Sequence, residues 1–387
     1  MARKTLAVLS VVTGLALVVA GCGSTSEVGG AGFGTQICGD SGATQPRYQA
    51  PFAPIPGGAN TLSGAGSSFV APMMADWTKA YSEQAQVQVS YQSVGSGAGV
   101  AQIQAGTVDF GASDTGISEA ETAKAKGPVQ QIPLLLGAVV PAYHLNGVPE
   151  GLRFTGDVLG KIFAGAITKW SDPALTALNP GVKLPDEPIA VVHRSDGSGT
   201  TGIWTDYLSK VSPDWVRKLG GATTAQGKDV AWPAGIGGKG NEGVAGAVSQ
   251  TEGSLGYLEL QYALAQQITY GQVQNKAGKF IQPCVATVIR AVNGVTFPPN
   301  LNTSLTDGTA ADAYPIAGTT YALVYQNQTD PAHAVALVNF LSWVLSAGQD
   351  RNPALNYAPL GPGLQRLSVE ALKKVTVNGA PIVPVAQ

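Results

Sequence analysis

The 387-residue sequence predicts an α/β fold with largely parallel sheets. Two observations carry this prediction. Short apolar segments typical of buried strands alternate with segments whose apolar residues recur at helical spacing. Glycine- and serine-rich turns repeatedly join a strand to the helix that follows it. The length corresponds to two domains or one large one, and it is ample for a buried core.

The N-terminus, residues 1–21, has the features of an export signal rather than of a folded segment. Arg3 and Lys4 precede the apolar run Leu6–Ala20, which is shorter than the about 20 residues that a spanning helix needs. Small residues then lead directly to Cys22, as in bacterial lipoprotein signals. We therefore expect cleavage before Cys22 and acylation of its thiol. An ordinary signal peptide followed by a chance cysteine is the alternative.

Residues 22–59 are rich in Gly, Ser, Thr and Pro and show no strand or helix period, so they predict a flexible tether. Two further cysteines remain, one in the tether and one in the body. An exported compartment permits oxidation, so we expect a Cys38–Cys284 disulfide that pins the tether onto the body. The three histidines are far apart and no paired-cysteine spacing occurs, which argues against a metal site.

The body alternates between predicted strands and helices. Val87–Tyr91 alternates apolar and polar residues, as a half-buried strand does. The other predicted elements are a helix at Ala71–Tyr81, a helix after Val100, a strand at Val108–Asp114, one or two buried strands in Ile132–Leu145, a helix in Phe154–Phe163, a buried strand at Ile189–His193 and a helix through Trp204 and Leu208.

The last predicted helix spans Asp330–Ala347. Asp330 is a good N-cap, Pro331 fits the first helical position, and Gly348 marks the end. Four apolar residues at helical spacing, Val335, Val338, Leu341 and Leu345, give this helix a face to bury.

Three turns of one design are the candidates for function: Gly64–Phe69, Gly95–Gly99 and Gly197–Thr200. Each couples glycines and hydroxyl groups to the start of a predicted helix. Glycine lets backbone amides approach a ligand closely, and a helix start offers unpaired N–H groups and partial positive charge. With Arg194 beside the third turn, they predict a site for one small anion. For any single turn, a purely structural role is the alternative.

Composition and motifs exclude several other functions. Only 12% of the residues are charged and the net charge is −2, which disfavours a basic nucleic-acid binder. None of the turns has the P-loop pattern Gly-x-x-x-x-Gly-Lys-Ser/Thr that binds nucleoside triphosphates. Around Ser198 the outer positions are Asp196 and Thr200 rather than glycines, which argues against a hydrolase nucleophile elbow.

Several segments together resemble the phosphate-binding protein of bacterial ABC-type phosphate importers. They are Gly64–Pro72, Val108–Asp114, Leu178–Gly181, Ser195–Thr200 and Gly318–Tyr321. The resemblance covers roughly residues 60–375. It implies a two-lobed fold of the type II periplasmic-binding-protein kind, with a two-segment hinge, that closes over one phosphate without catalysis or a cofactor.

The resemblance also implies the residues that contact phosphate. They are Ser67, Ser68 and Phe69 in the first turn, Ser96 in the second, Asp114 after its strand, and Arg194, Ser198, Gly199 and Thr200 at the third. Asp196 matches an acid that pairs with the arginine. Members of the family often have threonine where this chain has Ser68, and either hydroxyl can donate a hydrogen bond.

The carboxylate of Asp114 predicts selectivity between anions. A carboxylate repels an anion unless the anion carries a proton to donate to it. Phosphate near neutral pH carries one or two protons, whereas sulfate carries none, so sulfate would face an unpaired buried charge. The alternatives are a turn cap for Asp114, an isolated ion pair with Asp196 for Arg194, and plain core packing for Phe69.

The resulting expectation is a monomeric, lipid-anchored receptor outside the cytoplasm, on the bacterial cell membrane, that delivers phosphate to an ABC permease with its ATPase. Lobe one would comprise residues 60–143 plus 320–387, and lobe two residues 144–319. Three alternatives stay open: a receptor for another oxyanion or a phosphorylated small molecule, an exported phosphate-ester hydrolase, and a surface lipoprotein that has lost its ligand.

Overall fold

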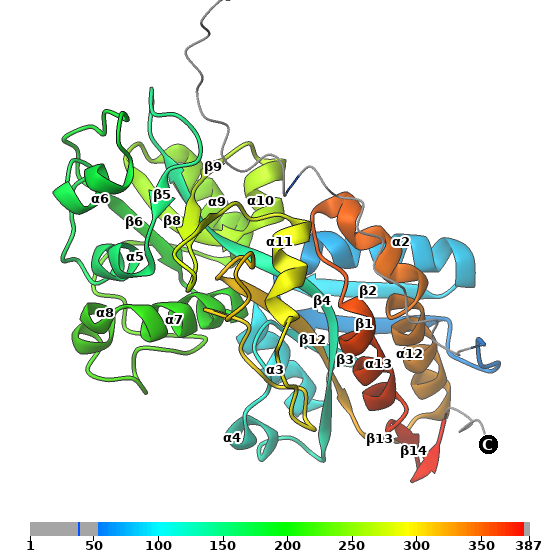
Figure 1. The fold of residues 1–387 in the computed structure, drawn as a ribbon. Helices are drawn as coiled ribbons and strands as arrows, with labels where there is room; N and C mark the ends of the chain where they lie inside the picture. Colours follow the sequence, from blue (N-terminus) through cyan, green and yellow to red (C-terminus); the bar gives the residue numbers. More distant parts are fainter. Residues whose placement is uncertain (1–37, 39–52, 383–387) are drawn as a thin grey trace, which may run out of the picture. The chain divides into compact units, whose positions relative to one another are not determined.

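A computed structural model describes Cys38 and residues 53–382 of the chain. The predicted signal, Cys22 and most of the predicted tether lie outside the described residues. The body is a mixed α/β fold built on a curled sheet, in which the strands follow the order β2-β1-β3-β12-β4-β8-β6-β7 and β9 pairs with β4 (Figure 1). These strands are β1 (Thr61–Gly66), β2 (Gln88–Ser93), β3 (Phe110–Ser113), β4 (Val129–His144), β6 (Ala190–Arg194), β7 (Ile236–Gly238), β8 (Ser254–Glu259), β9 (Thr269–Tyr270) and β12 (Ala317–Tyr325).

Helices cover this sheet, and two small sheets complete the fold. The α-helices are α2 (Ala71–Ala85), α3 (Ser96–Ala105), α4 (Glu119–Thr122), α5 (Gly156–Phe163), α6 (Pro173–Leu178), α7 (Gly199–Val211), α8 (Pro213–Lys218), α9 (Gly240–Gln250), α10 (Leu260–Ala265), α11 (Val285–Ile289), α12 (Pro331–Val344) and α13 (Gly361–Leu372). The 3₁₀ segments are η1 (Arg290–Val292) and η2 (Ala347–Leu355). The small sheets contain β5 (Arg153–Phe154), β10 (Gln272–Gln274) and β11 (Phe280–Ile281), and β13 (Asn327–Gln328), β14 (Thr376–Val377) and β15 (Ala380–Pro381).

The sheet contains two parallel groups of strands, which form the cores of two lobes. In the first lobe β1 pairs in parallel with both β2 and β3, and in the second lobe β6 pairs in parallel with both β7 and β8. The long strand β4 joins the groups: it pairs with β12 up to Ala138 and with β8 from Val139 onward. The lobe boundaries at 143/144 and 319/320 stay predictions.

A bulge interrupts the pairing of β4 with β12, where the register shifts between Thr320 and Tyr321. The partner residues there are Leu135 and Pro133, so Leu134 is the extra residue on β4. Proline has no N–H to offer the ladder, and a bulge is one of the few places in a sheet where it is tolerated. Pro133, which lies inside the apolar run Ile132–Leu145, thus lies at the bulge of β4.

Most elements that the sequence predicts are confirmed. The run Ile132–Leu145 forms one strand, β4, and Phe154–Phe163 divides into β5 and α5. The predicted cap of α12 is present, because the Asp330 carboxylate accepts from the N–H groups of Ala332 and His333. This helix ends at Val344 and continues as η2 rather than reaching Ala347. In the described part of the chain no single helix is long and apolar enough to cross a membrane. Only the bent pair of α12 and η2 together has the length and apolar composition of a membrane span.

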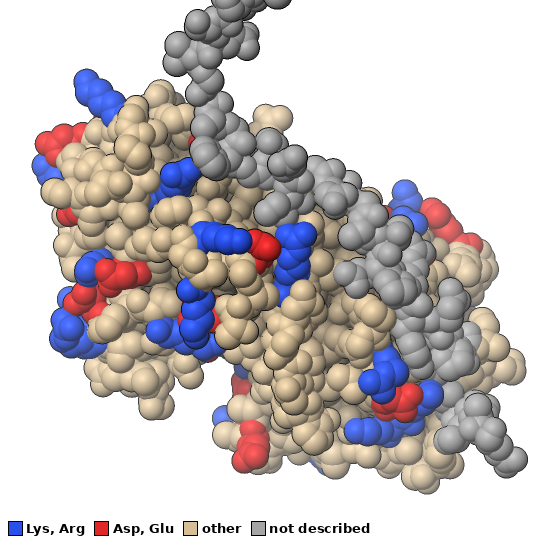
Figure 2. Space-filling view, in the orientation of Figure 1, with Lys and Arg blue, Asp and Glu red and all other residues tan. Residues whose placement is uncertain are grey.

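Charged side chains are sparse on the surface. On the face in Figure 2, Lys and Arg lie in small groups, mostly beside Asp or Glu, and uncharged residues cover most of the area between them. This view agrees with the low charged fraction of the sequence, 12%. An anion site in this body therefore has to draw on local donors rather than on a broad basic surface.

The N-terminal segment is attached to the body at two places. A disulfide joins Cys38 to Cys284, just before α11, with 5.9 Å between the two Cα atoms. Further along, the side-chain amide of Asn339 in α12 accepts from the N–H of Ile55 at 2.9 Å and donates to its carbonyl at 2.8 Å. The N–H of Ala59 also donates to the carbonyl of Ala332. The last residues of the predicted tether are thus bonded to α12.

Loss of the disulfide should destabilise the folded chain. We expect Cys284→Ser to lower the free energy of unfolding by about 2–4 kcal/mol, because the cross-link restricts the unfolded chain over a long loop. Urea titration of the oxidised wild type and the variant measures the difference. Reduced wild type is the matched control and should behave like the variant. Equal midpoints for all three proteins would show that the bond contributes nothing.

Candidate functional site

The predicted site residues follow the carboxyl ends of parallel strands in both lobes. The first turn follows β1, the second follows β2, Asp114 follows β3, and the third turn follows β6. In parallel sheets these strand ends are where ligand sites form. All the predicted phosphate contacts are buried, and even Asp114 is only 4% exposed. Gly66 ends β1 at φ +141°, and a Cβ there would lie 2.1 Å from the carbonyl oxygen of Ala112.

The second and third turns touch across the two lobes. The N–H of Gly97 donates to the carbonyl of Gly197 at 2.8 Å. A Cβ on Gly199 would lie 2.6 Å from the Ser96 hydroxyl oxygen and 2.6 Å from the backbone nitrogen of Asp114. The structure therefore places the third turn directly against Ser96 and Asp114, and only a residue without a side chain fits at Gly199.

Asp114 accepts hydrogen bonds from three hydroxyl groups on three separate segments. Its Oδ1 accepts from Ser67 at 2.5 Å and from Thr320 at 2.7 Å. Its Oδ2 accepts from Ser96 at 3.3 Å, the one donor to this oxygen among the residues that the structure describes. Burial raises the pKa of Asp114 to about 6, although these hydroxyls and the charge of Arg194 act to lower it. One oxygen of the carboxylate is thus well occupied, and the other has room for a further donor.

Arg194 is held by Asp196, as the sequence predicts. Its Nε and Nη2 donate to the two carboxylate oxygens of Asp196 at 2.8 and 2.6 Å, and its Nη1 lies 3.4 Å from the Thr200 hydroxyl. Partial burial acts to raise the pKa of Asp196, but the hydrogen bonds and charge of Arg194 hold it below its usual value. The guanidinium is only 3% exposed, so its position is fixed and its charge is largely balanced.

Two predicted contacts have other partners in this structure. The backbone N–H of Phe69 donates to the Ser67 hydroxyl oxygen at 3.0 Å, so this amide is already bonded within its own turn. The Ser198 hydroxyl accepts from the N–H of Thr201 at 3.0 Å and caps α7. Each of these hydroxyl oxygens accepts one hydrogen bond, and the Ser67 hydroxyl also donates its hydrogen to Asp114.

The structure adds two residues to which the sequence analysis gave no role. Thr320 lies in the segment Gly318–Tyr321, part of the family resemblance, and its hydroxyl donates to Asp114. Asn241 lies in a glycine-rich stretch, residues 235–243, where β7 turns into α9. That stretch has the same strand–glycine–helix design as the three predicted turns, and this design was the signal that could have identified it.

Asn241 connects the two lobes. Its side-chain nitrogen donates to the hydroxyl oxygens of Ser68 and Thr200, both at 3.0 Å, and its backbone N–H donates to Ser68 at 3.0 Å. Behind it, the backbone N–H of Glu259 donates to the Asn241 side-chain oxygen at 2.9 Å. Burial raises the pKa of Glu259 well above its usual range, and its carboxyl accepts from Tyr357 at 3.0 Å.

The N-termini of four helices add partial positive charge and backbone N–H groups to the site. Four helices, α2, α3, α7 and α9, begin within or directly after the segments just described. Their first N–H groups and dipoles favour a small anion, and the surrounding hydroxyls and Arg194 offer further donors. Among the described residues, no cluster of three or more His, Cys, Asp or Glu could hold a metal ion. The arrangement is suited to holding one small oxyanion.

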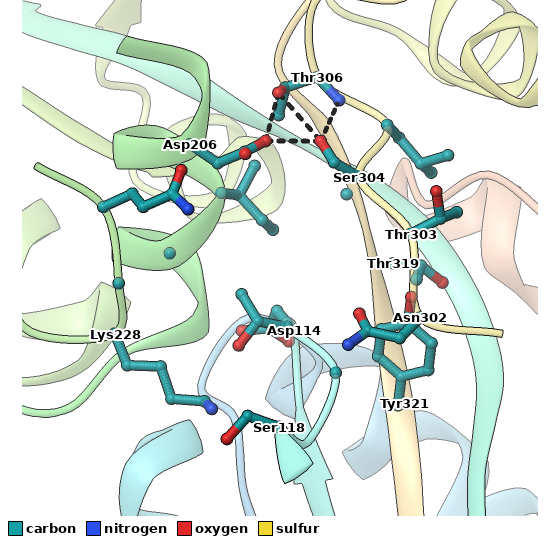
Figure 3. Close-up of a pocket in the computed structure, with 18 of the residues that line it drawn as sticks. Asp114, Ser118, Asp206, Lys228, Asn302, Thr303, Ser304, Thr306, Thr319 and Tyr321 are labelled. Carbon is teal, nitrogen blue, oxygen red and sulfur yellow. Dashed lines mark hydrogen bonds between the residues drawn. The ribbon is translucent and has the colours of Figure 1, made fainter. Parts of the chain in front are cut away.

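A pocket of about 580 Å³ lies beside Asp114, between residues of the two lobes (Figure 3). Its lining is rich in hydroxyl and amide groups, including Ser118, Thr319 and Asn302. Glu121 and Lys228 also line it, and they form an ion pair across the lobes at 2.8 Å. Although partial burial acts to raise the pKa of Glu121, the hydrogen bond from Lys228 keeps it below its usual value. The pocket borders the predicted anion site on one side of Asp114.

Comparisons with known proteins agree with this geometry. Residues 53–347 match the model of the PBP superfamily domain. The chain is 42% identical over 306 residues to the phosphate-binding protein PstS of Xylella fastidiosa, covering 78% of this chain and 82% of that protein. It is 40% identical to the protein of that name from Haemophilus influenzae, covering 80% of this chain and 90% of that protein.

Solved structures share the fold at lower identity. The phosphate-binding protein of Stenotrophomonas maltophilia is 20% identical, with a TM-score of 0.66 over 83% of this chain and 97% of that one. The two-lobed fold of the type II periplasmic-binding-protein kind is thus confirmed. From the superfamily match and the identity to its relatives, the chain belongs to the phosphate-binding protein PstS family.

Proposed function

We propose that this protein captures inorganic phosphate outside the cytoplasm and delivers it to an ABC-type phosphate permease. The observation that carries the proposal is the buried carboxylate of Asp114, which bonds to three hydroxyls of the first lobe while the third turn, from the second lobe, lies directly against it. Relatives at 40–42% identity are named phosphate-binding proteins. A Clostridium perfringens structure described as a putative phosphate ABC transporter substrate-binding protein with bound phosphate shares the fold, with a TM-score of 0.56 at 20% identity.

The predicted contacts supply phosphate with donors of three kinds. Ser68, Ser198 and Thr200 would offer hydroxyls, Gly199 a backbone amide, and Arg194 its free guanidinium hydrogens. The Ser96 hydroxyl and the Phe69 amide would donate to phosphate only by leaving their present acceptors, Asp114 and the Ser67 hydroxyl. Ser67 would act mainly by holding Asp114. The pairing of Arg194 with Asp196 supports a site that binds through dipoles rather than net positive charge.

The role of Asp114 is to accept a hydrogen bond from a protonated oxygen of phosphate. Its Oδ1 is occupied by two close hydroxyl donors, whereas its Oδ2 has only the 3.3 Å bond from Ser96. A phosphate O–H could therefore donate to Oδ2. Sulfate near neutral pH has no such hydrogen, so its oxygens would face this carboxylate unpaired.

The proposal extends to the N-terminus of the chain. Acylation at Cys22 would hold the protein on the outer face of the cell membrane, and the body would act as a monomer. The signal-like residues 1–21 and the small residues before Cys22 support this anchor. The protein would bind and hand over its ligand without catalysing a reaction.

Purified protein stripped of its ligand should bind one phosphate per chain and discriminate against sulfate. We expect sulfate binding to be at least about 100-fold weaker at pH 8, since an unpaired buried charge costs several kcal/mol. Isothermal titration with phosphate, sulfate and a phosphate monoester measures the three affinities. Sulfate binding as tight as phosphate binding would refute the role of Asp114, and preference for the monoester would identify a different ligand.

The sulfate affinity of the wild type should increase as the pH falls through about 6. The pKa of Asp114 is raised to about 6, so below that value the carboxyl gains a proton that it can donate to a sulfate oxygen. Asp114→Asn provides a permanent donor and should bind sulfate with little pH dependence. Titrations of both proteins between pH 5 and pH 8 measure this, and a flat wild-type profile would contradict it.

The same raised pKa predicts how stability changes with pH. Because the folded-state pKa lies above the unfolded value, the stabilising contribution is complete below about pH 3.8 and is lost as the pH rises through about 6. A shift of about two units corresponds to about 3 kcal/mol. Ligand-free wild type should therefore lose stability relative to Asp114→Asn between pH 4 and pH 7 in denaturant titrations. A constant difference between the two proteins would show that the pKa is not raised.

A further inference from the structure

The side chain of Asn241 has a single possible orientation. The backbone N–H of Glu259 can only donate, and it points to the Asn241 side-chain oxygen at 2.9 Å. The opposite end of the amide must therefore be the NH₂ group, which faces Ser68 and Thr200. Asn241 is completely buried, at 0% exposure, so water does not compete for these bonds.

This orientation limits what the Ser68 hydroxyl can do. A hydroxyl has one hydrogen to donate and two lone pairs that accept. The Ser68 oxygen accepts from both the backbone N–H and the side-chain NH₂ of Asn241, each at 3.0 Å. Both lone pairs are then in use, and only the hydrogen remains. Within the described part of the chain this hydrogen has no acceptor.

The Thr200 hydroxyl is in the same position. Its oxygen accepts from the Asn241 side chain at 3.0 Å and from Nη1 of Arg194 at 3.4 Å. Its hydrogen, too, has no acceptor among the residues that the structure describes. The contrast is with the hydroxyls of Ser67, Ser96 and Thr320, whose hydrogens are donated to Asp114. The hydroxyls of the site thus form two groups with different directions.

We propose that Asn241 is a positioning residue that turns the hydroxyl hydrogens of Ser68 and Thr200 toward the bound anion. The inference rests on the proposed function, because it takes these two hydroxyls as anion donors. Thr200 lies in the same lobe as Asn241, whereas Ser68 lies in the other, so the orientation of the Ser68 hydroxyl also depends on closure of the lobes. Phosphate and sulfate both present acceptor oxygens, so Asn241 increases the affinity for either anion without choosing between them.

Asn241→Leu removes the side-chain amide at similar volume and tests the proposal. We expect phosphate binding to weaken by about 10- to 100-fold, because two donors to the anion lose their fixed direction. The ratio of phosphate to sulfate affinity should stay within about threefold of the wild-type ratio. A ratio that changes as much as in Asp114→Asn would overturn the proposal. Titration calorimetry at pH 8 on ligand-stripped protein gives both values.

A double-mutant cycle separates positioning from a merely structural role. In a background that carries Ser68→Ala and Thr200→Val, Asn241→Leu should weaken phosphate binding by less than about threefold, because there are no hydroxyls left to orient. An equal loss in both backgrounds would mean that Asn241 acts in another way. Asn241→Ala, in the same cycle, serves if the leucine variant does not fold.

Asn275→Leu is the matched control. Asn275 is another buried amide of the second lobe, and it bonds to the carbonyls of Ala311 and Ala313 away from the site. Its loss should lower the thermal midpoint and leave phosphate affinity unchanged. If the wild type binds no phosphate, the proposed function itself fails. If the wild type binds phosphate and the cycle is additive, only the role of Asn241 fails.

Discussion

The burial of one carboxylate, that of Asp114, constrains the design of the whole site. A carboxylate that is 4% exposed requires hydrogen-bond donors, and here they come from the turn after β1, the start of α3 and the strand β12. Thr320 lies 206 positions from Asp114 in the sequence. The sheet brings them together because β1 and β3 are parallel and end at the same edge, while β12 runs antiparallel beside β3 and carries Thr320 past its end. The fold and the carboxylate therefore depend on each other.

Charge balance follows from the same constraint. Arg194 is buried but is paired in a bidentate way with Asp196, so it adds directional donors with little net charge. The backbone N–H of Gly240, at the start of α9, also donates to Asp196 at 3.0 Å. A helix start of the second lobe thus helps to fix Arg194 at the site by bonding to its partner Asp196. The donors that remain for an anion are neutral groups and an arginine whose charge is already paired with Asp196. An anion site of this kind can therefore form in a chain with few charged residues.

Local patterns were sufficient for much of this architecture. Strand, turn and helix alternate as predicted, and the three glycine turns, Asp114 and Arg194 do converge. The sequence could not show which hydroxyls face Asp114 and which face Asn241, because these contacts join residues 18 to 206 positions apart. Thr320 lies on a strand rather than in a glycine turn, so the segment Gly318–Tyr321 contributed to the family resemblance without giving Thr320 a role. Asn241 follows a glycine-rich stretch, but only the packing of the lobes gives its amide a role.

The shortage of charge at the site has a consequence for the medium in which the protein works. Salt screens interactions between exposed charges over about 8–10 Å at ordinary ionic strength, but it acts much less on buried dipoles. A receptor that attracted its ligand through a basic surface would lose affinity as the surroundings became saltier. Hydrogen bonds from buried amides, buried hydroxyls and an arginine paired with Asp196 are weakened much less by added salt. A small anion held in such a site is expected to bind with nearly the same affinity at low and at high ionic strength.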